Sequence, residues 1–307
     1  MHARSDLLLC AFVLLVACEG DPPLVSAPAV PMAATAAAQP ASESPRAEGV
    51  TLISNGDEPR RALRWAPAAG TRQTVRLTVS SKSEMRAGAQ GTPAAVSVPP
   101  IQADVQVVVG PAPASGGLQG EAVLGLARVP GDAKGNPELV GLIESTLSNL
   151  GGSRGRWARD PRGLGPPLAL EAPVMATAPA RELLASLNDA LAALALELPE
   201  EAVGPGARWR SLQGGTRRTA ILLRFDGDRA VLEVELETGG QVTTLPGMGM
   251  RRTARQAGKG LLTLDLARPL PAAAELSLEQ QAEVELPDRA GPPARFATTT
   301  EITLVTP

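Results

Sequence analysis

The fold follows from the stretch Thr74-Val75-Arg76-Leu77-Thr78-Val79-Ser80, in which polar and aliphatic side chains alternate strictly. Successive side chains of a β-strand point to opposite faces, so this stretch predicts a strand with one solvated face and one buried face. Antiparallel sheets commonly combine one packed face with one solvated face, and the pattern therefore predicts an antiparallel sheet. The same alternation returns in residues 101–107, 118–129, 230–237, 275–285 and 295–305.

Short segments rich in Gly, Pro and Asp are predicted to join these strands into hairpins. Residues 110–117 and 288–293 are two such segments, and residues 155–170 are predicted as a hairpin of their own that turns at 160–163. Asp226-Gly227-Asp228 is predicted as a hairpin turn, because the sequence after it does not continue as a calcium-binding loop. The glutamate rows in the later strands are predicted to lie on a solvated face, with an acidic binding face as the alternative.

A first helix is predicted in the middle of the chain, near residues 137–150. Asn136-Pro137 has the residue types of a helix start, with Asn as the cap and Pro at the first helical position. Apolar residues at helical spacing follow, and Gly151-Gly152 is typical of a helix end.

A second helix is predicted near residues 179–198. It begins after Thr177, a residue type that favours the cap position, and Pro199 is predicted to end it. One face is apolar and the acidic residues Glu182, Asp189 and Glu197 lie away from it. The apolar face comprises Leu183, Leu184, Leu187, Leu191, Leu194 and Leu198.

The predicted fold class is α+β and mainly β: a curved antiparallel sheet, either an incomplete barrel or two half-sheets, with the two mid-chain helices. One option is two β lobes (50–135 and 205–307) joined by a helical segment (136–204). A short similarity between the segments that follow Trp65 and Trp209 leaves an internal duplication open. Core packing is the interpretation of both tryptophans.

An apolar run at the N-terminus, residues 7–16, overlaps the stretch Leu15-Val16-Ala17-Cys18. Its ten residues span about 15 Å as a helix, roughly half of a bilayer core, which is too short for a transmembrane helix. A basic start, a short apolar run and small residues after it are typical of an export signal. Residues 15–18 resemble the lipobox of bacterial envelope lipoproteins, and an ordinary signal peptide with an incidental cysteine is the alternative.

This resemblance implies that residues 1–17 are a lipoprotein signal peptide and that Cys18 is lipidated. Such proteins carry several acyl chains on this cysteine, and more than one chain gives stable membrane anchoring. The implied location is the cell envelope, facing the periplasm or at the cell surface, and Glu19 in place of Asp favours the outer membrane. Residues 18–49, mostly Ala, Pro, Ser and Glu, are predicted as a disordered tether to a folded domain of residues 50–307.

The composition excludes several kinds of chemistry. The chain has one histidine, His2, no tyrosine and two cysteines, of which Cys10 lies within the signal. Without His or a second Cys, the mature chain has no Ser-His-Asp or Cys-His site, no His-ligated zinc and no disulfide. No cofactor or metal is predicted, and a net charge of −3 gives no basic surface for nucleic acid. The protein is predicted not to be an enzyme; paired carboxylates are the remaining route to catalysis.

The general plan is similar to the periplasmic lipoprotein carriers and lipid-binding envelope lipoproteins, which are half-barrels plugged by helices. This resemblance implies a non-catalytic binder of an apolar or acyl ligand, and it carries no site residue over. From the residues themselves, Leu183, Leu187 and Leu191 and the loop methionines Met248 and Met250 are predicted to line the ligand cavity. The alternative is a structural lipoprotein without a ligand that docks to an envelope protein; an apolar cavity above roughly 300 Å³ favours the first function and a filled core the second.

Overall fold

The computed structural model describes residues 49–86, 94–114, 116–131, 136–244, 251–285 and 293–307. The predicted signal peptide, Cys18 and the tether lie outside these ranges, and so do Met248 and Met250. None of the helices within the described ranges is long and apolar enough to cross a membrane.

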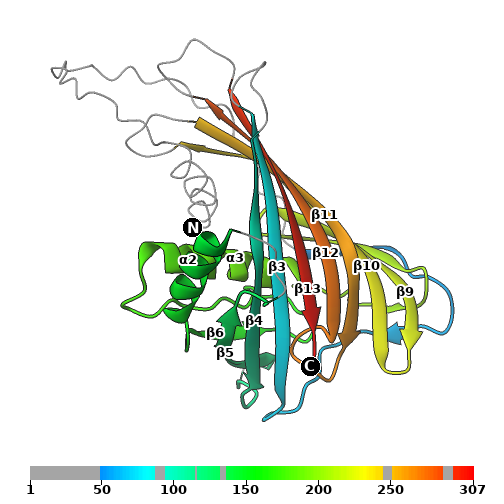
Figure 1. Ribbon diagram of the computed structural model, residues 1–307. Helices are drawn as coiled ribbons and strands as arrows, with labels where there is room; N and C mark the ends of the chain where they lie inside the picture. The colour runs from blue at the N-terminus through cyan, green and yellow to red at the C-terminus, as the bar shows by residue number, and fades with distance from the viewer. Residues whose placement is uncertain (1–48, 87–93, 115, 132–135, 245–250, 286–292) are drawn as a thin grey trace, which may run out of the picture. The chain divides into compact units, whose positions relative to one another are not determined.

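The described chain is mainly β, as the alternation predicts, and its principal element is one sheet of eleven strands (Figure 1). All its neighbouring strands are antiparallel, and the edge strands β1 and β6 are at opposite ends of the strand order, so the sheet is open. In spatial order its strands are β1 (Gly49–Ser54), β8 (Arg208–Gln213), β9 (Thr216–Asp226), β10 (Arg229–Thr244), β11 (Arg251–Asp265), β12 (Ala273–Glu285), β13 (Ala294–Val305), β3 (Arg72–Arg86), β4 (Ala94–Val109), β5 (Leu118–Arg128) and β6 (Arg154–Arg159). A separate pair consists of β2 (Arg61–Ala62) and β7 (Ala202–Val203).

The last strand of the chain, β13, joins the strands from the early part of the sequence to those from the late part. β13 pairs with β12 on one side and with β3 on the other, over eleven residue pairs from Arg295↔Arg86 to Val305↔Arg76. The segments 50–135 and 205–307 therefore belong to one sheet, where the sequence analysis left two lobes open. The apolar faces of β3 and β13 coincide in this register, which buries both at once.

The predicted hairpins are present where turn residues lie between two alternating strands. Asp226 pairs with Arg229 at the tip of the β9–β10 hairpin, and Gly227 has a positive φ of 61°, which a side chain would disfavour. β12 and β13 pair along their lengths, as predicted for residues 275–285 and 295–305. Glu233, Glu235 and Glu237 are all exposed, which confirms the solvated face.

The prediction of a hairpin over residues 155–170 is only partly right. The chain turns at the expected place, where Asp160 Oδ1 accepts the backbone N–H groups of Arg162 and Leu164. After the turn, however, the chain forms no strand, and only a single bridge between Arg154 and Glu171 returns to β6. This irregular segment instead packs at the base of the sheet.

Both helices begin at the predicted caps. Asn136 caps α2 (Pro137–Ser148) by accepting the N–H of Glu138, and Thr177 caps α3 (Ala178–Ala193) by accepting the N–H of Ala180. Asn and Thr side chains at the cap position accept hydrogen bonds from backbone N–H groups that have no carbonyl partner within the first turn of the helix.

The predicted end of the second helix at Leu198 is wrong, because α3 ends at Ala193. Residues before a proline avoid the helical region, so Pro199 disfavours helix at Leu198. The extended segment is held by tertiary contacts: the Leu198 N–H donates to the Arg162 carbonyl, and Trp209 Nε1 donates to the Glu197 carbonyl. Glu197, predicted to lie away from the apolar face, is 1% exposed.

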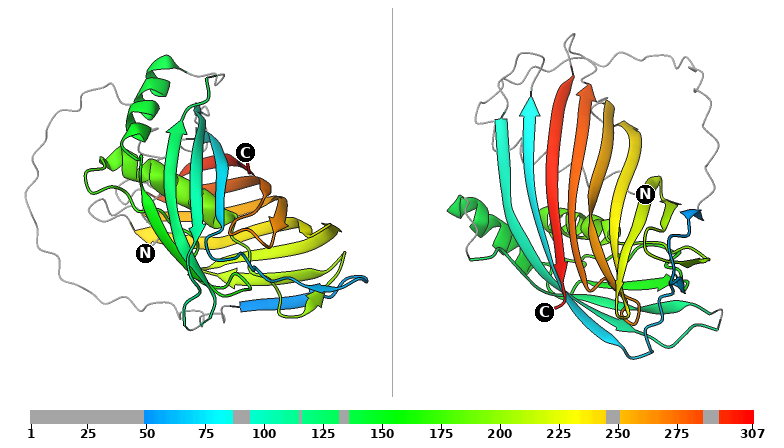
Figure 2. Two further views of the ribbon diagram at one scale, coloured as in Figure 1. Left: turned by 90° about the horizontal axis from the view of Figure 1, so that it is seen from below. Right: turned by 90° about the vertical axis from the view of Figure 1, so that its right-hand side faces the viewer.

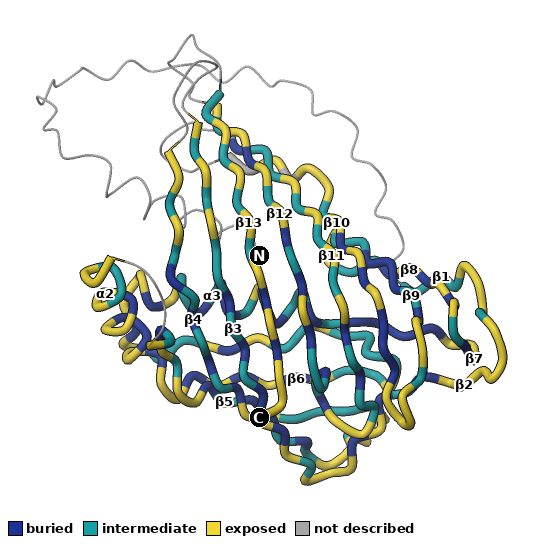
Figure 3. The backbone as a smooth tube through the Cα atoms, turned by 45° about the vertical axis from the view of Figure 1, so that its right-hand side comes forward, coloured by how far each residue is buried: buried dark blue, intermediate teal, exposed yellow. Residues whose placement is uncertain are grey.

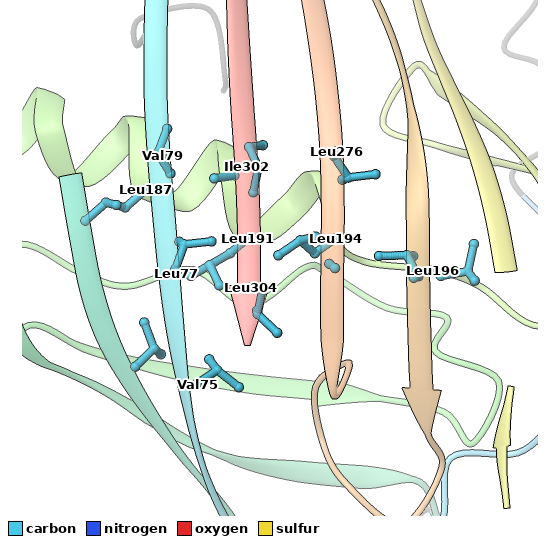
Figure 4. Close-up of a cluster of buried hydrophobic side chains, with 14 of the residues drawn as sticks. Val75, Leu77, Val79, Leu187, Leu191, Leu194, Leu196, Leu276, Ile302 and Leu304 are labelled. Atoms are coloured by element: carbon cyan, nitrogen blue, oxygen red, sulfur yellow. The ribbon is translucent and has the colours of Figure 1, made fainter. Parts of the chain in front are cut away.

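The hydrophobic core lies between α3 and one face of the sheet, here called the concave face (Figures 2 and 4). In Figure 4, Leu187, Leu191 and Leu194 of the α3 region lie beside aliphatic side chains of β3, β12 and β13. The opposite face of the sheet, here called the convex face, carries the exposed polar side chains. The sheet is therefore two-sided in the way its alternation predicts.

The two tryptophans of the suspected duplication have different settings. Trp209 lies within β8, paired with Ala220 of β9, whereas Trp65 lies outside the strands and its backbone N–H donates to the Pro161 carbonyl. Both are buried, at 0% and 2% exposure, which agrees with core packing. The backbone around them does not repeat.

Candidate functional site

The concave face can be described as rows of directly paired residues that cross the central strands. Paired residues of neighbouring antiparallel strands share a face, so each row lies on one side of the sheet. Two rows form the covered half, the part of the concave face that packs against α3, and their members are buried apart from one partly exposed glycine. In the order β3, β13, β12, β11 and β10, these rows are Leu77, Leu304, Ala274, Leu262 and Leu232, and then Val79, Ile302, Leu276, Gly260 and Val234.

The long strands continue past α3, and this part of the concave face is here called the projecting half (Figures 1 and 3). Its side chains are mostly partly exposed, in contrast to those of the covered half. Three further rows make it up. In the same strand order they are Ser81, Thr300, Leu278, Gly258 and Leu236, then Ser83, Thr298, Gln280, Gln256 and Thr238, and then Met85, Phe296, Ala282 and Ala254.

Charge distinguishes the two faces of the projecting half. None of the described residues in its three rows is charged, whereas the residues between them in sequence, which point to the convex face, include both signs. Val96 and Val98 of β4 extend two of the rows with further apolar side chains. At the borders of the rows lie two buried arginines on the same face: Arg218 of β9, which pairs with Leu236, and Arg252 of β11, two residues outward from Ala254. The convex face at the same level carries Lys82, Glu84, Arg86, Arg255, Glu279, Glu283 and Arg295.

The hydroxyl groups of the projecting half bond to one another across strands. Ser81 Oγ lies 3.1 Å from Thr300 Oγ1, and Ser83 Oγ lies 3.0 Å from Thr298 Oγ1. Covering a hydroxyl with an apolar group costs less free energy when the hydroxyl keeps a hydrogen bond to another side chain than when it loses its bond to water. The paired hydroxyls therefore make this uncharged surface more compatible with an apolar ligand.

The five predicted ligand residues are not brought together in the described chain. Leu187 and Leu191 are buried in the core, at 2% and 5% exposure, and Leu183 is partly buried on the same helix. Met248 and Met250 lie outside the described residues, in the connection between β10 and β11. The leucines thus serve to attach α3 to the sheet in this form of the protein.

Two cavities of the described chain bear on ligand binding. A groove of about 350 Å³ crosses the outer ends of β3, β11, β12 and β13, and its walls include Glu84, Arg86, Arg255, Glu283 and Arg295. A cavity of about 40 Å³ lies at the base of the sheet, between α3, the segment after β6 and residues 269–271. The first is lined by charges and the second is small, so neither is the large apolar cavity that would place a ligand between α3 and the sheet.

The small cavity at the base is lined by a cation between two indole rings. The Arg159 guanidinium lies 4.5 Å from the centre of the Trp65 ring and 5.2 Å from that of Trp157. Burial lowers the pKa of Arg159 to about 10, and the nearby charge of Asp160 acts in the opposite direction. Two aromatic faces and the Pro269 carbonyl, which accepts a hydrogen bond from Nη2, stabilise the buried charge.

A second buried charge ties the end of α3 to the sheet. Glu197 accepts a hydrogen bond of 2.5 Å from Ser211 Oγ, and its Oε1 lies 3.6 Å from Arg218 Nη1. Arg218 Nη2 also donates to the Ala192 carbonyl in the last turn of α3. Glu197 is the one carboxylate among the buried residues of the described chain, and an arginine faces it.

This arrangement bears on catalysis and metal binding. Two-carboxylate chemistry needs a second acid near Glu197, and within the described ranges the buried acidic and basic residues offer Arg218 instead. The described ranges also contain no group of three or more His, Cys, Asp or Glu side chains placed to hold a metal ion. That the protein is not an enzyme stays a prediction.

Sequence reasoning missed the projecting half as a site. Residues 80–84 read Ser-Ser-Lys-Ser-Glu, with polar side chains on both faces, so no period of two is visible there. The signal that could have revealed it is the placement of the charges of β3, β10, β12 and β13 on one alternate set of positions in each strand. No protein-family model matches the chain, and no curated protein is similar to it in sequence.

Proposed function

We propose that the protein is a lipid-anchored protein of the bacterial cell envelope that holds an apolar or acyl ligand on the concave face of the projecting half. The observation that carries this proposal is the lack of charge in the three partly exposed rows across β3, β13, β12, β11 and β10, opposite a convex face rich in Lys, Arg and Glu. Charged side chains would oppose an acyl chain, and their absence from these rows leaves a surface on which it can lie.

The size of this surface fits a lipid chain. Three rows separated by two residues each, across five strands, cover on the order of 250 Å². Exposed surfaces of a few hundred Å² with apolar character are typical of ligand or partner sites. Met85, Phe296 and Leu278 provide the larger apolar side chains, and the paired hydroxyls fill the space between them.

The position of the ligand differs from the sequence-based expectation. Leu187 and Leu191 fill the interface between α3 and the covered half, so the ligand would lie beyond this helix and not beneath it. In this proposal the leucines of α3 close the base of the ligand surface.

The alternative function is a structural lipoprotein that docks to an envelope protein. The observation that favours it is the filled core: the cavity beside Leu191 has a volume of about 40 Å³. A protein partner needs no cavity and could cover either the projecting half or the groove at its outer end.

Native mass spectrometry distinguishes the two functions. The mature chain with Cys18→Ser, exported to a periplasm on another signal peptide, is expected to carry a mass excess that organic extraction removes. A bare polypeptide mass would count against the ligand and favour the search for a partner by crosslinking in the envelope.

Matched variants on β13 locate the ligand. Thr298→Glu places a charge on the concave face, whereas Thr299→Glu places the same charge on the convex face beside Lys82. The first variant is expected to lose the mass excess and the second to keep it. Equal ligand content in both, with both proteins folded by circular dichroism, would show that the ligand lies elsewhere.

The anchor is tested separately in the full-length chain. Labelled palmitate is expected to be incorporated, and Cys18→Ser is expected to abolish both the label and membrane association. Labelling that persists without Cys18, or an unlabelled wild-type chain that is nonetheless cleaved, would contradict lipidation at this residue.

A further inference from the structure

The cavity at the base of the sheet is bordered by three N–H donors that lack a protein acceptor. Trp65 and Trp157, at 2% and 7% exposure, both line it, and their Nε1 atoms have no hydrogen-bond partner among the described residues. The Nε of Arg159, which also lines the cavity, is in the same situation. Buried indole N–H groups nearly always find an acceptor, so three such donors around one cavity require an explanation.

The Arg159 cation of the cavity is near the charge of Asp160 but forms no salt bridge with a carboxylate among the described residues. Arg159 is bonded to the Pro269 carbonyl, and its sequence neighbour Asp160 uses its carboxylate on the N–H groups of Arg162 and Leu164 and on the Arg162 guanidinium. Burying a cation is costly unless an opposite charge or a set of hydrogen bonds compensates. The indole faces supply part of this compensation. The three unpaired N–H donors still need an acceptor, which a bound ligand would supply.

We propose that this cavity binds a small monovalent anion such as chloride, held by the Nε1–H groups of Trp65 and Trp157 and the Nε–H of Arg159. The three donors and the cation provide the chemistry that an anion needs and that the surrounding backbone leaves unused. A volume of about 40 Å³ accommodates one halide ion, which is little larger than a water molecule.

Gly163 packs directly against one of the donors. A methyl group on this residue would lie 3.2 Å from Trp65 Nε1 and 2.6 Å from the Leu196 carbonyl oxygen, and Gly163 has a positive φ of 85°. Only glycine therefore fits where the turn after β6 passes the edge of the Trp65 indole.

Thermal unfolding in different salts tests the proposal with the mature Cys18→Ser chain. Sodium chloride or bromide is compared with sodium gluconate, whose anion is too large for the cavity, at equal ionic strength. A ligand that binds the folded state raises the melting temperature with its concentration. The wild-type chain is therefore expected to melt at a higher temperature in halide than in gluconate.

The three tryptophans provide matched variants. Trp65→Phe with Trp157→Phe keeps both rings beside Arg159 but removes both N–H donors, and this double variant is expected to lose most of the halide effect. Trp209→Phe is the control, because Trp209 Nε1 already donates to the Glu197 carbonyl at 2.8 Å. It is expected to melt at a lower temperature but to keep the halide effect in full.

Crystals grown in sodium bromide provide a measurement that does not depend on how the variants fold. An anomalous bromine peak within hydrogen-bonding distance of Trp65 Nε1 and Trp157 Nε1 is expected. A water molecule in place of bromide, or equal melting temperatures in halide and gluconate, would overturn the proposal. Failure here leaves the ligand on the projecting half unaffected, because the two sites lie at different ends of the sheet and have different readouts.

Discussion

A single strand, β3, passes through two different environments on the same face of the sheet. Val75, Leu77 and Val79 lie in the covered half and are buried, whereas Ser81, Ser83 and Met85 lie in the projecting half and are partly exposed. The strand continues without a break in its pairing to β13 from one environment to the other. The pairing of β3 with β13 therefore extends beyond the part of the sheet that α3 covers.

The convex face does not show this difference. Arg76 and Thr78 lie opposite the covered half and Lys82 and Glu84 lie opposite the projecting half, and all four are polar or charged. The three rows of the projecting half are thus uncharged although most of their side chains are partly exposed. If the sheet beyond α3 needed only to be soluble, charged side chains would be expected on both of its faces. The difference in charge between the concave and convex faces is the reason to look for a ligand on the concave face.

The largest effect is expected from the charge pair that holds α3 over the covered half. Glu197→Leu leaves Arg218 buried without its partner, and removal of one member of a buried pair typically costs about 3–5 kcal/mol of unfolding free energy. The double variant Glu197→Leu with Arg218→Met is expected to lose less, because no charge is then left unpaired. Urea unfolding of the three proteins checks this; a single variant as stable as the double one would contradict it.

A smaller effect is expected from apolar truncation, and it should differ between the two halves. Leu77→Ala removes side-chain volume from the filled core and is expected to lower the free energy of unfolding by about 3 kcal/mol. Met85→Ala, on the same face of the same strand, is expected to cost less than about 1 kcal/mol, since its side chain is already partly exposed. Urea unfolding measures both, and equal losses would mean that Met85 is also part of the core.

The covered half could be predicted from sequence because its physics is local. Alternation in residues 74–80 fixes the buried face, and Asn136 and Thr177 are capping residues whose hydrogen bonds involve only the next few residues. The turn at 226–228 is likewise decided by a glycine with positive φ. These features need no knowledge of the rest of the chain.

The features that were missed depend on contacts between distant segments. The end of α3 at Ala193 and the burial of Glu197 depend on Trp209, Ser211 and Arg218, which follow much later in the chain. The paired hydroxyls of β3 and β13 are more than two hundred residues apart, with sequence separations of 219 and 215. Residues 80–84 and 298–300 show no alternation of apolar and polar side chains, so the pairing of these hydroxyls follows only from the sheet register.

The hydroxyl pairs allow the projecting half to be made more like the covered half. Thr298→Val removes one partner of the Ser83–Thr298 pair and is expected to cost about 1 kcal/mol, the usual value for one hydrogen bond. Adding Ser83→Ala removes the Ser83 hydroxyl that has lost its partner and is expected to recover part of the lost free energy of unfolding. Urea unfolding measures stability, and native mass spectrometry is expected to show more bound ligand in the double variant, whose surface is more apolar.

The smallest effect is expected on α3 itself, at Glu182. Burial raises the pKa of the Glu182 carboxyl above its ordinary value, so the folded state binds a proton more readily than the unfolded state. The contribution of this group to stability is therefore fully present below the unfolded pKa and is lost as the pH rises through the folded pKa. Glu182→Gln is accordingly expected to raise the melting temperature slightly at pH 7 and to leave it unchanged near pH 3.

Glu233→Gln is the control for replacing a carboxylate by an amide, because Glu233 is exposed on the convex face of β10. If the two variants respond alike, Glu182 is solvated and α3 covers less of the sheet than its contacts indicate. If only Glu182→Gln raises the melting temperature at pH 7 and not near pH 3, the ionised Glu182 carboxylate is partly buried and lowers the stability of the protein.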